Sequence, residues 1–127
     1  MKVLLDANAL MMPAQFQLDL FGELRELLGA YEPLILQGVR KELEGLSHEK
    51  GRNGAAARHG LSVGEKCTLV ESEDSGSGTV DSQLIEYATR RNCMVVTNDR
   101  GVRDALLARG LCVISLRKQK KLEIIRR

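Results

Sequence analysis

The sequence predicts an α/β domain, a three-layer α/β/α sandwich in which helices cover both faces of a central parallel sheet of about five strands. Two observations predict this fold class. Short apolar segments alternate with longer amphipathic segments along the 127 residues. The apolar segments also lack the polar-apolar alternation of half-exposed strands, and continuous apolar runs are typical of strands buried on both faces of a parallel sheet.

The expected strands are short apolar runs, and they cover residues 3–5, 34–36, 68–70, 94–96 and 112–114. The first strand ends at Asp6, and the second begins directly after Pro33. From Ser115 onward the chain is expected to continue either as a short further strand or as an exposed extension.

The expected helices separate these strands, and they cover residues 17–28, 38–46, 54–67, 80–91 and 102–109. In the first helix the leucines recur at helical spacing, and Gly29 suits the end of that helix. Gly110 suits the end of the last helix in the same way. Residues 71–78 read ESEDSGSG, a polar, glycine-containing loop that we expect to be the most flexible segment.

The composition is that of one globular domain. Hydrophobic residues make up 43% and charged residues 28% of the chain, which excludes a disordered protein. Aromatic residues make up only 3%, so we expect a core of Leu, Val, Ile and Ala. The scarcity of aromatic residues also disfavours the base-stacking surfaces of single-strand-binding modules.

Several features favour a cytoplasmic protein. No apolar run approaches the roughly 20 residues that cross a bilayer, so no membrane partner is expected. Asp6 interrupts the apolar N-terminal segment, which is unlike a secretory signal peptide. The three cysteines, Cys67, Cys93 and Cys112, form no CxxC pair, and we expect them to be reduced thiols.

The charges divide the chain into a domain over residues 1–116 and a basic C-terminal extension over residues 117–127. The net charge is +2, and the extension holds six basic residues against one acid, which leaves −3 for the domain. Such a distribution suits a protein that concentrates cations in one region and binds phosphates with another.

Two aspartates stand at the ends of expected strands. Asp6 follows the strand VLL, and Asp99 follows the strand MVV within VVTND. Because the carboxyl ends of parallel strands meet at one edge of a sheet, both residues are expected on the edge where ligands bind. The alternative is that each aspartate only caps the helix behind it. Two aspartates at equivalent strand ends favour the shared site.

Two further acids lie beside buried faces of expected helices. Glu42 falls at the edge of the apolar stripe that includes Val39 and Leu43. A charge beside the core needs a partner, either a shared metal ion or an ordinary salt bridge. Asp81 lies in the first turn of its helix, where an acid suits the helix dipole, but we expect it to project toward the sheet.

The carboxylates that meet these criteria are Asp6, Glu42, Asp81 and Asp99. Gathered at one edge they would repel one another, and hard divalent cations such as Mg²⁺ or Mn²⁺ prefer oxygen ligands. No His or Cys shares the pattern, which disfavours zinc. His48 and His59 lie in a polar, glycine-containing segment and are expected at the surface.

The runs VLLDANAL, VRKELEGL, VDSQLIEYA and VVTNDRGVRDALLARG, in this order, resemble the four acidic motifs of PIN-domain nucleases. The resemblance spans nearly the whole chain. The runs MMPAQF and VISLRKQKKLE resemble a narrower group. These are the archaeal single-domain PIN proteins related to the eukaryotic endonuclease that processes small-subunit ribosomal RNA precursors.

The resemblance implies that one or two Mg²⁺ or Mn²⁺ ions are bound by the four catalytic acids, Asp6, Glu42, Asp81 and Asp99. Thr97 and Asn98 match the polar residues that position the attacking water in this family. Many toxin members carry a further acid two residues after the last aspartate, where this chain has Gly101. Asp104 lies nearby but one helical face away, so the resemblance leaves a fifth ligand open.

The implied substrate is RNA, and a ribosomal RNA precursor in the narrower group. The basic residues that fit phosphate binding are Arg100, Arg103, Arg117, Lys118, Lys120 and Lys121. Each of them would otherwise be a solvated surface charge. Ribosome-assembly proteins and a second copy of the chain are further implied partners, although no exposed apolar stripe requires a dimer.

The sequence also bears on four other functions. A VapC-type toxin would use the same chemistry, although such toxins usually lack a basic extension. A non-catalytic PIN scaffold in ribosome assembly would not need four intact acids. An aspartyl-phosphate phosphatase needs a second Asp where this chain has Asn8. A receiver domain needs an acceptor Asp after its third strand, where only Glu71, Glu73 and Asp74 occur, in a loop.

Overall fold

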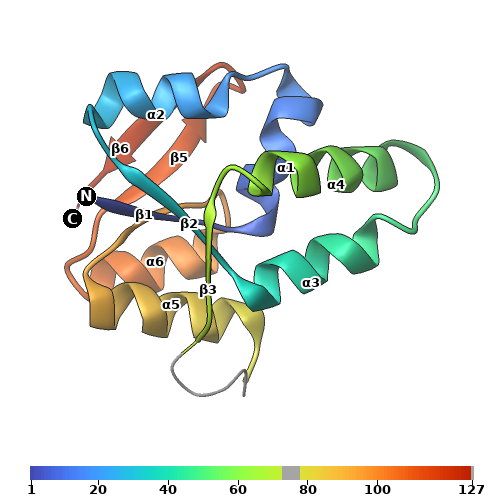
Figure 1. Ribbon diagram of the computed structural model, residues 1–127. Coiled ribbons are helices and arrows are strands. Elements are labelled where there is room, and N and C mark those ends of the chain that lie inside the picture. The colour runs from blue at the N-terminus through green and yellow to red at the C-terminus, as the bar shows by residue number, and fades with distance from the viewer. Residues whose placement is uncertain (73–77, 127) are drawn as a thin grey trace.

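The structure is a computed structural model that describes residues 1–72 and 78–126 (Figure 1). Part of the loop expected at residues 71–78, including Glu73 and Asp74, lies outside the described residues, as does Arg127. The elements follow in the order β1 (Lys2–Leu5), α1 (Ala7–Phe16), α2 (Leu20–Leu28), β2 (Glu32–Leu36), α3 (Gln37–Leu46), α4 (Gly51–Gly64), β3 (Thr68–Val70), α5 (Val80–Arg91), β4 (Met94–Val96), α6 (Arg100–Ala108), β5 (Val113–Arg117) and β6 (Lys121–Ile125).

One six-stranded sheet runs through the molecule in the order β3-β2-β1-β4-β5-β6. The first five of these strands are parallel, and β6 is antiparallel to β5, with Arg117 opposite Lys121. The three-layer α/β/α fold is confirmed, with one strand more than the expected five. The additional strand is β6, which comes from residues that the sequence assigned to a basic extension.

The helices lie on both sides of the strands. Figure 1 shows α2 above the sheet and α5 and α6 together below it. The helices α1, α3 and α4 gather at the right of the same view, where α4 packs against both α1 and α3. This arrangement places the beginnings of α1, α3, α5 and α6 at the carboxyl edge of the sheet, because each of them follows a strand or the loop after one.

The core consists of aliphatic side chains, as expected. Leu4 of β1, Leu36 of β2, Val96 of β4 and Ile114 of β5 are fully buried, and most other buried residues are also Leu, Val, Ile, Ala or Met. Burial of these apolar side chains is the main stabilising contribution to such a fold. None of the described helices has the length and hydrophobicity to span a membrane.

The three cysteines are free, which confirms that they form no disulfide. Cys93 is buried, while Cys67 and Cys112 are half-buried. Burial raises the pKa of the Cys67 thiol to about 11 and that of the Cys93 thiol in the same direction. Both side chains therefore remain uncharged thiols at neutral pH.

The main error of the sequence-based prediction concerns residues 7–16, which were given no element and form α1. Gln17, expected to begin the first helix, instead ends α1 in the left-handed conformation (φ 52°). The next helix, α2, begins at Leu20, because the Asp19 side chain accepts the N–H of Gly22 at 3.2 Å and caps it. Similarly, α4 begins at Gly51 and ends at Gly64, three residues earlier than expected at each end.

Candidate active site

A hollow of about 180 Å³ at the carboxyl edge of the sheet brings together four acids from four segments of the chain. They are Asp6 after β1, Glu42 on α3, Asp81 in the first turn of α5 and Asp99 before α6. The strands β1 and β4 are parallel neighbours, so the residues that follow them emerge side by side. The structure therefore places all four predicted acids around one space.

Asp6 is the most buried of these acids, with 9% of its surface exposed. Its carboxylate accepts the N–H of Ala9 at 2.7 Å, which caps α1, and it is hydrogen-bonded to the side chain of Thr97. Burial raises the pKa of Asp6 to about 6, and the negative charges of Asp81 and Glu42 act in the same direction. The hydrogen bonds oppose this rise but do not cancel it.

Asp99 is exposed at the beginning of α6, and its Oδ1 atom accepts the N–H of Val102 at 2.9 Å. Asp6 and Asp99 thus both cap a helix and line the hollow. Each residue is a helix cap and also a member of the shared acidic site. Thr97 connects them from a fully buried position. Its hydroxyl accepts the N–H of Asp99 at 3.1 Å and is hydrogen-bonded to the Asp6 carboxylate.

Glu42 and Asp81 are more exposed than the helix patterns suggested. Asp81 was expected to point inward, and its side chain instead lies at the solvent-facing rim of the hollow. Partial burial raises the pKa of Glu42, and the charge of Asp81 adds to this rise. The two acids are therefore close enough to repel each other across the opening.

The donor set fits a hard divalent cation. All four acids offer oxygen atoms, which Mg²⁺ and Mn²⁺ prefer, and a cation would relieve the repulsion that helps to raise the pKa of Asp6 and Glu42. Within residues 1–72 and 78–126, however, no three acidic, histidine or cysteine side chains are arranged to enclose an ion. Binding would therefore require at least some of the exposed carboxylates to turn toward the ion.

Asn98, the other residue matched to a water-positioning role, is not among the residues that line this hollow. Its Oδ1 atom accepts the N–H of Leu116 at 2.8 Å and thereby ties the strand end of β4 to β5. Asp104 does not line the hollow either, and it pairs with Arg103 at 3.4 Å. Asp104 is therefore not positioned to act as a fifth ligand beside the four acids.

The basic residues lie along the same edge of the sheet. Arg100 is exposed at the first position of α6, directly after Asp99. Lys118 and Lys120 are exposed in the turn between β5 and β6, which follows the carboxyl end of β5. Lys121 is exposed where β6 begins, and Arg117 pairs with Glu123 at 3.5 Å. A phosphate chain that reaches the acids therefore meets positive charge on the side of β5.

Two residues that line the hollow were not among the site residues predicted from the sequence. Ala7 and Asn8, in the first turn of α1, also line it, and the Asn8 side chain is exposed. The signal was present, since Asp6 is a favoured helix cap and a helix beginning there turns Asn8 toward the other acids.

The sequence is similar to a known family and to two named ribonucleases. A family model described as a PIN like domain matches residues 3–119, which include all four acids. Ribonuclease VapC9 of Archaeoglobus fulgidus is 35% identical over 117 residues, covering 91% of this chain and 83% of that protein. Ribonuclease VapC4 of Methanocaldococcus jannaschii is 27% identical over 128 residues, covering 97% of this chain and 95% of that protein.

Solved structures share the fold at lower sequence identity. The PIN domain endonuclease Utp24 has a TM-score of 0.82 at 24% identity, with 99% of this chain and 92% of that chain covered. VapBC2 from Rickettsia felis, solved bound to a DNA fragment from the promoter, has a TM-score of 0.66 at 16% identity, with 92% and 100% covered. At such identities the likeness establishes the fold alone.

Proposed function

The chain belongs to the family of PIN-like domains, and from this premise we propose that it is a metal-dependent endoribonuclease that hydrolyses phosphodiester bonds of RNA. One observation carries the proposal: Asp6, Glu42, Asp81 and Asp99 come from four separate segments and line one hollow. The relatives of this chain that are named ribonucleases support the choice of RNA as the substrate class.

In the proposed site, Asp6, Asp81 and Asp99 hold one or two Mg²⁺ or Mn²⁺ ions, and Glu42 either joins them or orients the attacking water. Such ions make water acidic and stabilise the leaving oxygen of an in-line displacement. The proposed reaction forms a bond between the water oxygen and phosphorus and breaks the bond to the 3′ oxygen, which takes up a proton. The products then carry a 5′-phosphate and a 3′-hydroxyl.

The residues of the chain contribute position and charge to this reaction. The two buried hydrogen bonds of Asp6 hold its carboxylate in one orientation. Thr97 sets the relative positions of Asp6 and Asp99. The proposed role of Arg100 is to neutralise the phosphate next to the scissile bond. Lys118 and Lys120, in the β5–β6 turn, would neutralise phosphates farther along the RNA.

The proposed target is a ribosomal RNA precursor, because the C-terminal run VISLRKQKKLE resembles the archaeal group related to the rRNA-processing endonuclease. A VapC-type toxin is the second candidate, favoured by the 35% identity to ribonuclease VapC9. A toxin would act with a protein antitoxin as its partner. The two candidates can be distinguished by expressing the native chain in a host that lacks an antitoxin. If the host stops growing, and does not stop when Asp99→Asn is expressed instead, the result favours the toxin.

The central test compares cleavage by the native chain and by Asp6→Asn and Asp99→Asn, in a Mn²⁺ titration on single-stranded and structured RNA. We expect each substitution to lower the cleavage rate about 100-fold or more, because a metal ligand contributes several kcal/mol to transition-state stabilisation. Asn is as good a helix cap as Asp, so α1 and α6 should stay intact in these variants.

The matched control is Asp104→Asn, which makes the same chemical change five residues after Asp99 but outside the hollow. This variant should cleave RNA at the native rate. Native activity in Asp99→Asn would refute the assigned roles. RNA binding without cleavage at any Mn²⁺ concentration would support a non-catalytic scaffold instead.

A further inference from the structure

A second hollow, of about 860 Å³, lies at the amino end of β2, at the opposite edge of the sheet from the acids. It is lined by Phe21 and Arg25 of α2, by Gly29 and Tyr31 from the segment that leads into β2, and by Lys66 after α4, together with Ala30 and Pro33. We call this hollow the amino-edge groove. None of the catalytic candidates lines it.

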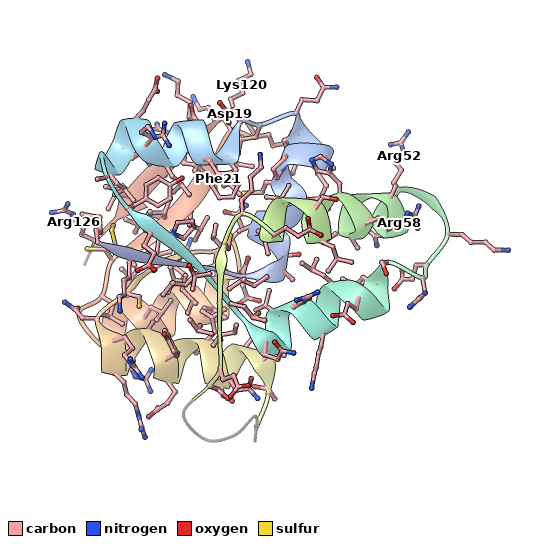
Figure 2. The ribbon with its side chains drawn as sticks, viewed as in Figure 1. Asp19, Phe21, Arg52, Arg58, Lys120 and Arg126 are labelled. Atoms are coloured by element: carbon pink, nitrogen blue, oxygen red, sulfur yellow. The ribbon has the colours of Figure 1, made fainter. Side chains whose placement is uncertain are left out.

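The amino-edge groove collects aromatic side chains in a protein that has few of them. The chain holds two Phe and two Tyr, and Phe21 and Tyr31 both line this groove. Figure 2 shows Phe21 projecting from α2 on the side of β2. The Tyr31 hydroxyl donates a hydrogen bond to the Phe21 carbonyl oxygen at 3.1 Å, which fixes the two residues relative to each other. Both side chains are half-buried, so part of each remains accessible.

The charged side chains that line the amino-edge groove are all cationic. Arg25 follows Phe21 by four residues on α2 and therefore shares its face. The Nζ atom of Lys66 lies 5.9 Å from the centre of the Phe21 ring, within the range of a cation–π contact. Among the residues that the structure describes, neither Arg25 nor Lys66 is in a salt bridge, and no acid lines the groove.

We propose that the amino-edge groove binds a single-stranded segment of RNA at a site separate from the acids. Aromatic rings stack on bases of any sequence, and unpaired cations attract phosphates. Gly29 (φ 74°) leaves the groove open, since a Cβ added there would meet no atom within 4 Å. The choice of RNA rather than another polyanion rests on the proposed ribonuclease function.

The two sites are far enough apart to hold different parts of one RNA chain. The groove lies at the amino end of β2, and the acids lie beyond the carboxyl end of the neighbouring strand β1. A five-residue strand spans about 16 Å, so several nucleotides separate the two sites along a bound strand. The groove would thus hold RNA away from the cleaved bond.

The test measures binding of a fluorescently labelled single-stranded RNA of about 16 nucleotides by anisotropy. All proteins carry Asp99→Asn, and EDTA is present, so binding is measured without cleavage. The groove variants are Arg25→Gln and Phe21→Leu. The matched control is Arg52→Gln, the same chemical change at an exposed residue at the far end of α4 (Figure 2). Competition by a mononucleotide and by inorganic phosphate is measured alongside.

We expect Phe21→Leu to bind RNA about tenfold more weakly, in the range for loss of a base stack. Arg25→Gln should weaken binding by a similar factor, because it removes a cation that neutralises a phosphate, while Arg52→Gln should stay within about twofold of the parent. Arg25 is exposed, so Arg25→Gln should fold even if Phe21→Leu disturbs packing, and thermal unfolding checks both. Equal affinity of Arg25→Gln and Arg52→Gln for RNA would overturn the proposal. The proposal would also be overturned if the groove variants bound RNA normally and only competition by the mononucleotide or by phosphate became weaker. The groove would then bind only small ligands.

The outcome is separable from that of the proposed function. If the native chain never cleaves RNA but the groove variants lose RNA binding, the nuclease proposal fails and the groove remains an RNA site. If the native chain cleaves RNA while the groove variants bind it normally, only the groove proposal fails.

Discussion

The carboxylate of Asp6 is held at the beginning of α1 by the N–H of Ala9 and by Thr97, and the same carboxylate lines the acidic hollow. Burial makes its ionised form costly in the absence of a cation. The ionised carboxylate is also repelled by Asp81 and Glu42, and binding of a divalent ion or a proton would relieve this repulsion. Asp6 therefore affects both the stability of the fold, as the cap of α1, and the proposed reaction, as a metal ligand.

The first prediction concerns the pH dependence of stability. The unfolded chain binds the Asp6 proton with a pKa near 3.8, and the folded chain binds it with a pKa of about 6. Because the folded state binds more protons between these values, metal-free protein should lose stability as the pH rises from 4 through 6. The shift corresponds to about 3 kcal/mol, and it is measured by urea unfolding in EDTA at a series of pH values.

The control for this prediction is Asp6→Asn, which keeps a capping side chain but does not titrate. Its stability should be nearly independent of pH over the same interval, apart from the smaller contribution of Glu42. Addition of Mn²⁺ at pH 7 should stabilise the native chain more than the variant, since only binding to the folded state raises stability. Parallel pH profiles for both proteins would contradict this account of Asp6.

Thr97 is a positioning residue, and its hydroxyl can be removed with little change of shape. In Thr97→Val the Asp6 carboxylate and the N–H of Asp99 both lose a buried partner. We expect kcat to fall about 10- to 100-fold, as for other residues that orient metal ligands. The pKa of Asp6 should also rise further, which would shift the acid limb of the pH–rate profile to higher pH.

The matched control is Thr97→Ser, which keeps the hydroxyl and should restore both the rate and the position of the acid limb. A Thr97→Val protein with lower stability but an unchanged pH–rate profile would show that the residue acts only on the fold.

At the scale of elements, the packing of α4 depends on glycine. A Cβ added at Gly54 would overlap the carbonyl oxygen of Glu49, and one added at Gly60 would lie 3.2 Å from the carbonyl oxygen of Leu10 on α1. By contrast, a Cβ added at Gly45 of α3 would meet nothing within 4 Å. Glycine is therefore needed for close packing at Gly54 and Gly60, but not at Gly45.

This contrast predicts opposite effects of one substitution. Gly54→Ala should lower the free energy of unfolding by about 1 to 3 kcal/mol, because backbone must move to admit the methyl group. Gly45→Ala should raise it by up to about 1 kcal/mol, because Ala is the better helix former. Chemical unfolding of both variants checks the prediction, and destabilisation by Gly45→Ala would contradict it.

Elements were predictable where local pattern and packing agree. The leucine spacing of α2 and the apolar runs of β1, β2 and β4 were found from the sequence to within a few residues. The helix α1 was missed because Pro13, which cannot donate a backbone hydrogen bond, interrupts the helical pattern of the run ANALMMPAQF. Its helix is stabilised by the Asp6 cap and by packing against α4.

The sequence does not distinguish β6 from an exposed extension, because Lys121 and Glu123, two of its five residues, are charged. Pairing with β5, burial of Leu122 and the Glu23 carboxylate, which accepts the N–H of Leu122 at 3.2 Å, hold it in the sheet. Removal of residues 117–127 would therefore damage the fold. RNA binding by the basic residues has to be tested with point substitutions.

At the scale of the whole molecule, the carboxyl edge of the sheet combines a cluster of acids with exposed lysines in the β5–β6 turn. Neutralisation of Lys118 and Lys120 with Gln should weaken RNA binding. It should also reduce the slope of log affinity against log salt by about 1.4, from about 0.7 for each single-strand phosphate contact. The affinity is measured in EDTA over a series of salt concentrations.

The control makes an equal change of charge elsewhere, with Lys50→Gln and Arg52→Gln at the beginning of α4. These two residues are exposed and lie outside both hollows. If both double variants reduce the slope equally, the turn contributes only to the general charge of the protein.

The sequence by itself determined the α/β class, the four acids and the oxygen-only chemistry that they offer, because strand ends, helical periodicity and residue type are local properties. The tertiary structure alone decided that these acids share one hollow, that residues 121–125 complete the sheet, and that Phe21 and Tyr31 meet with Arg25 and Lys66 in the amino-edge groove. Such features depend on contacts between residues far apart in the chain. Those contacts follow from the packing of whole helices and strands, which no local pattern encodes.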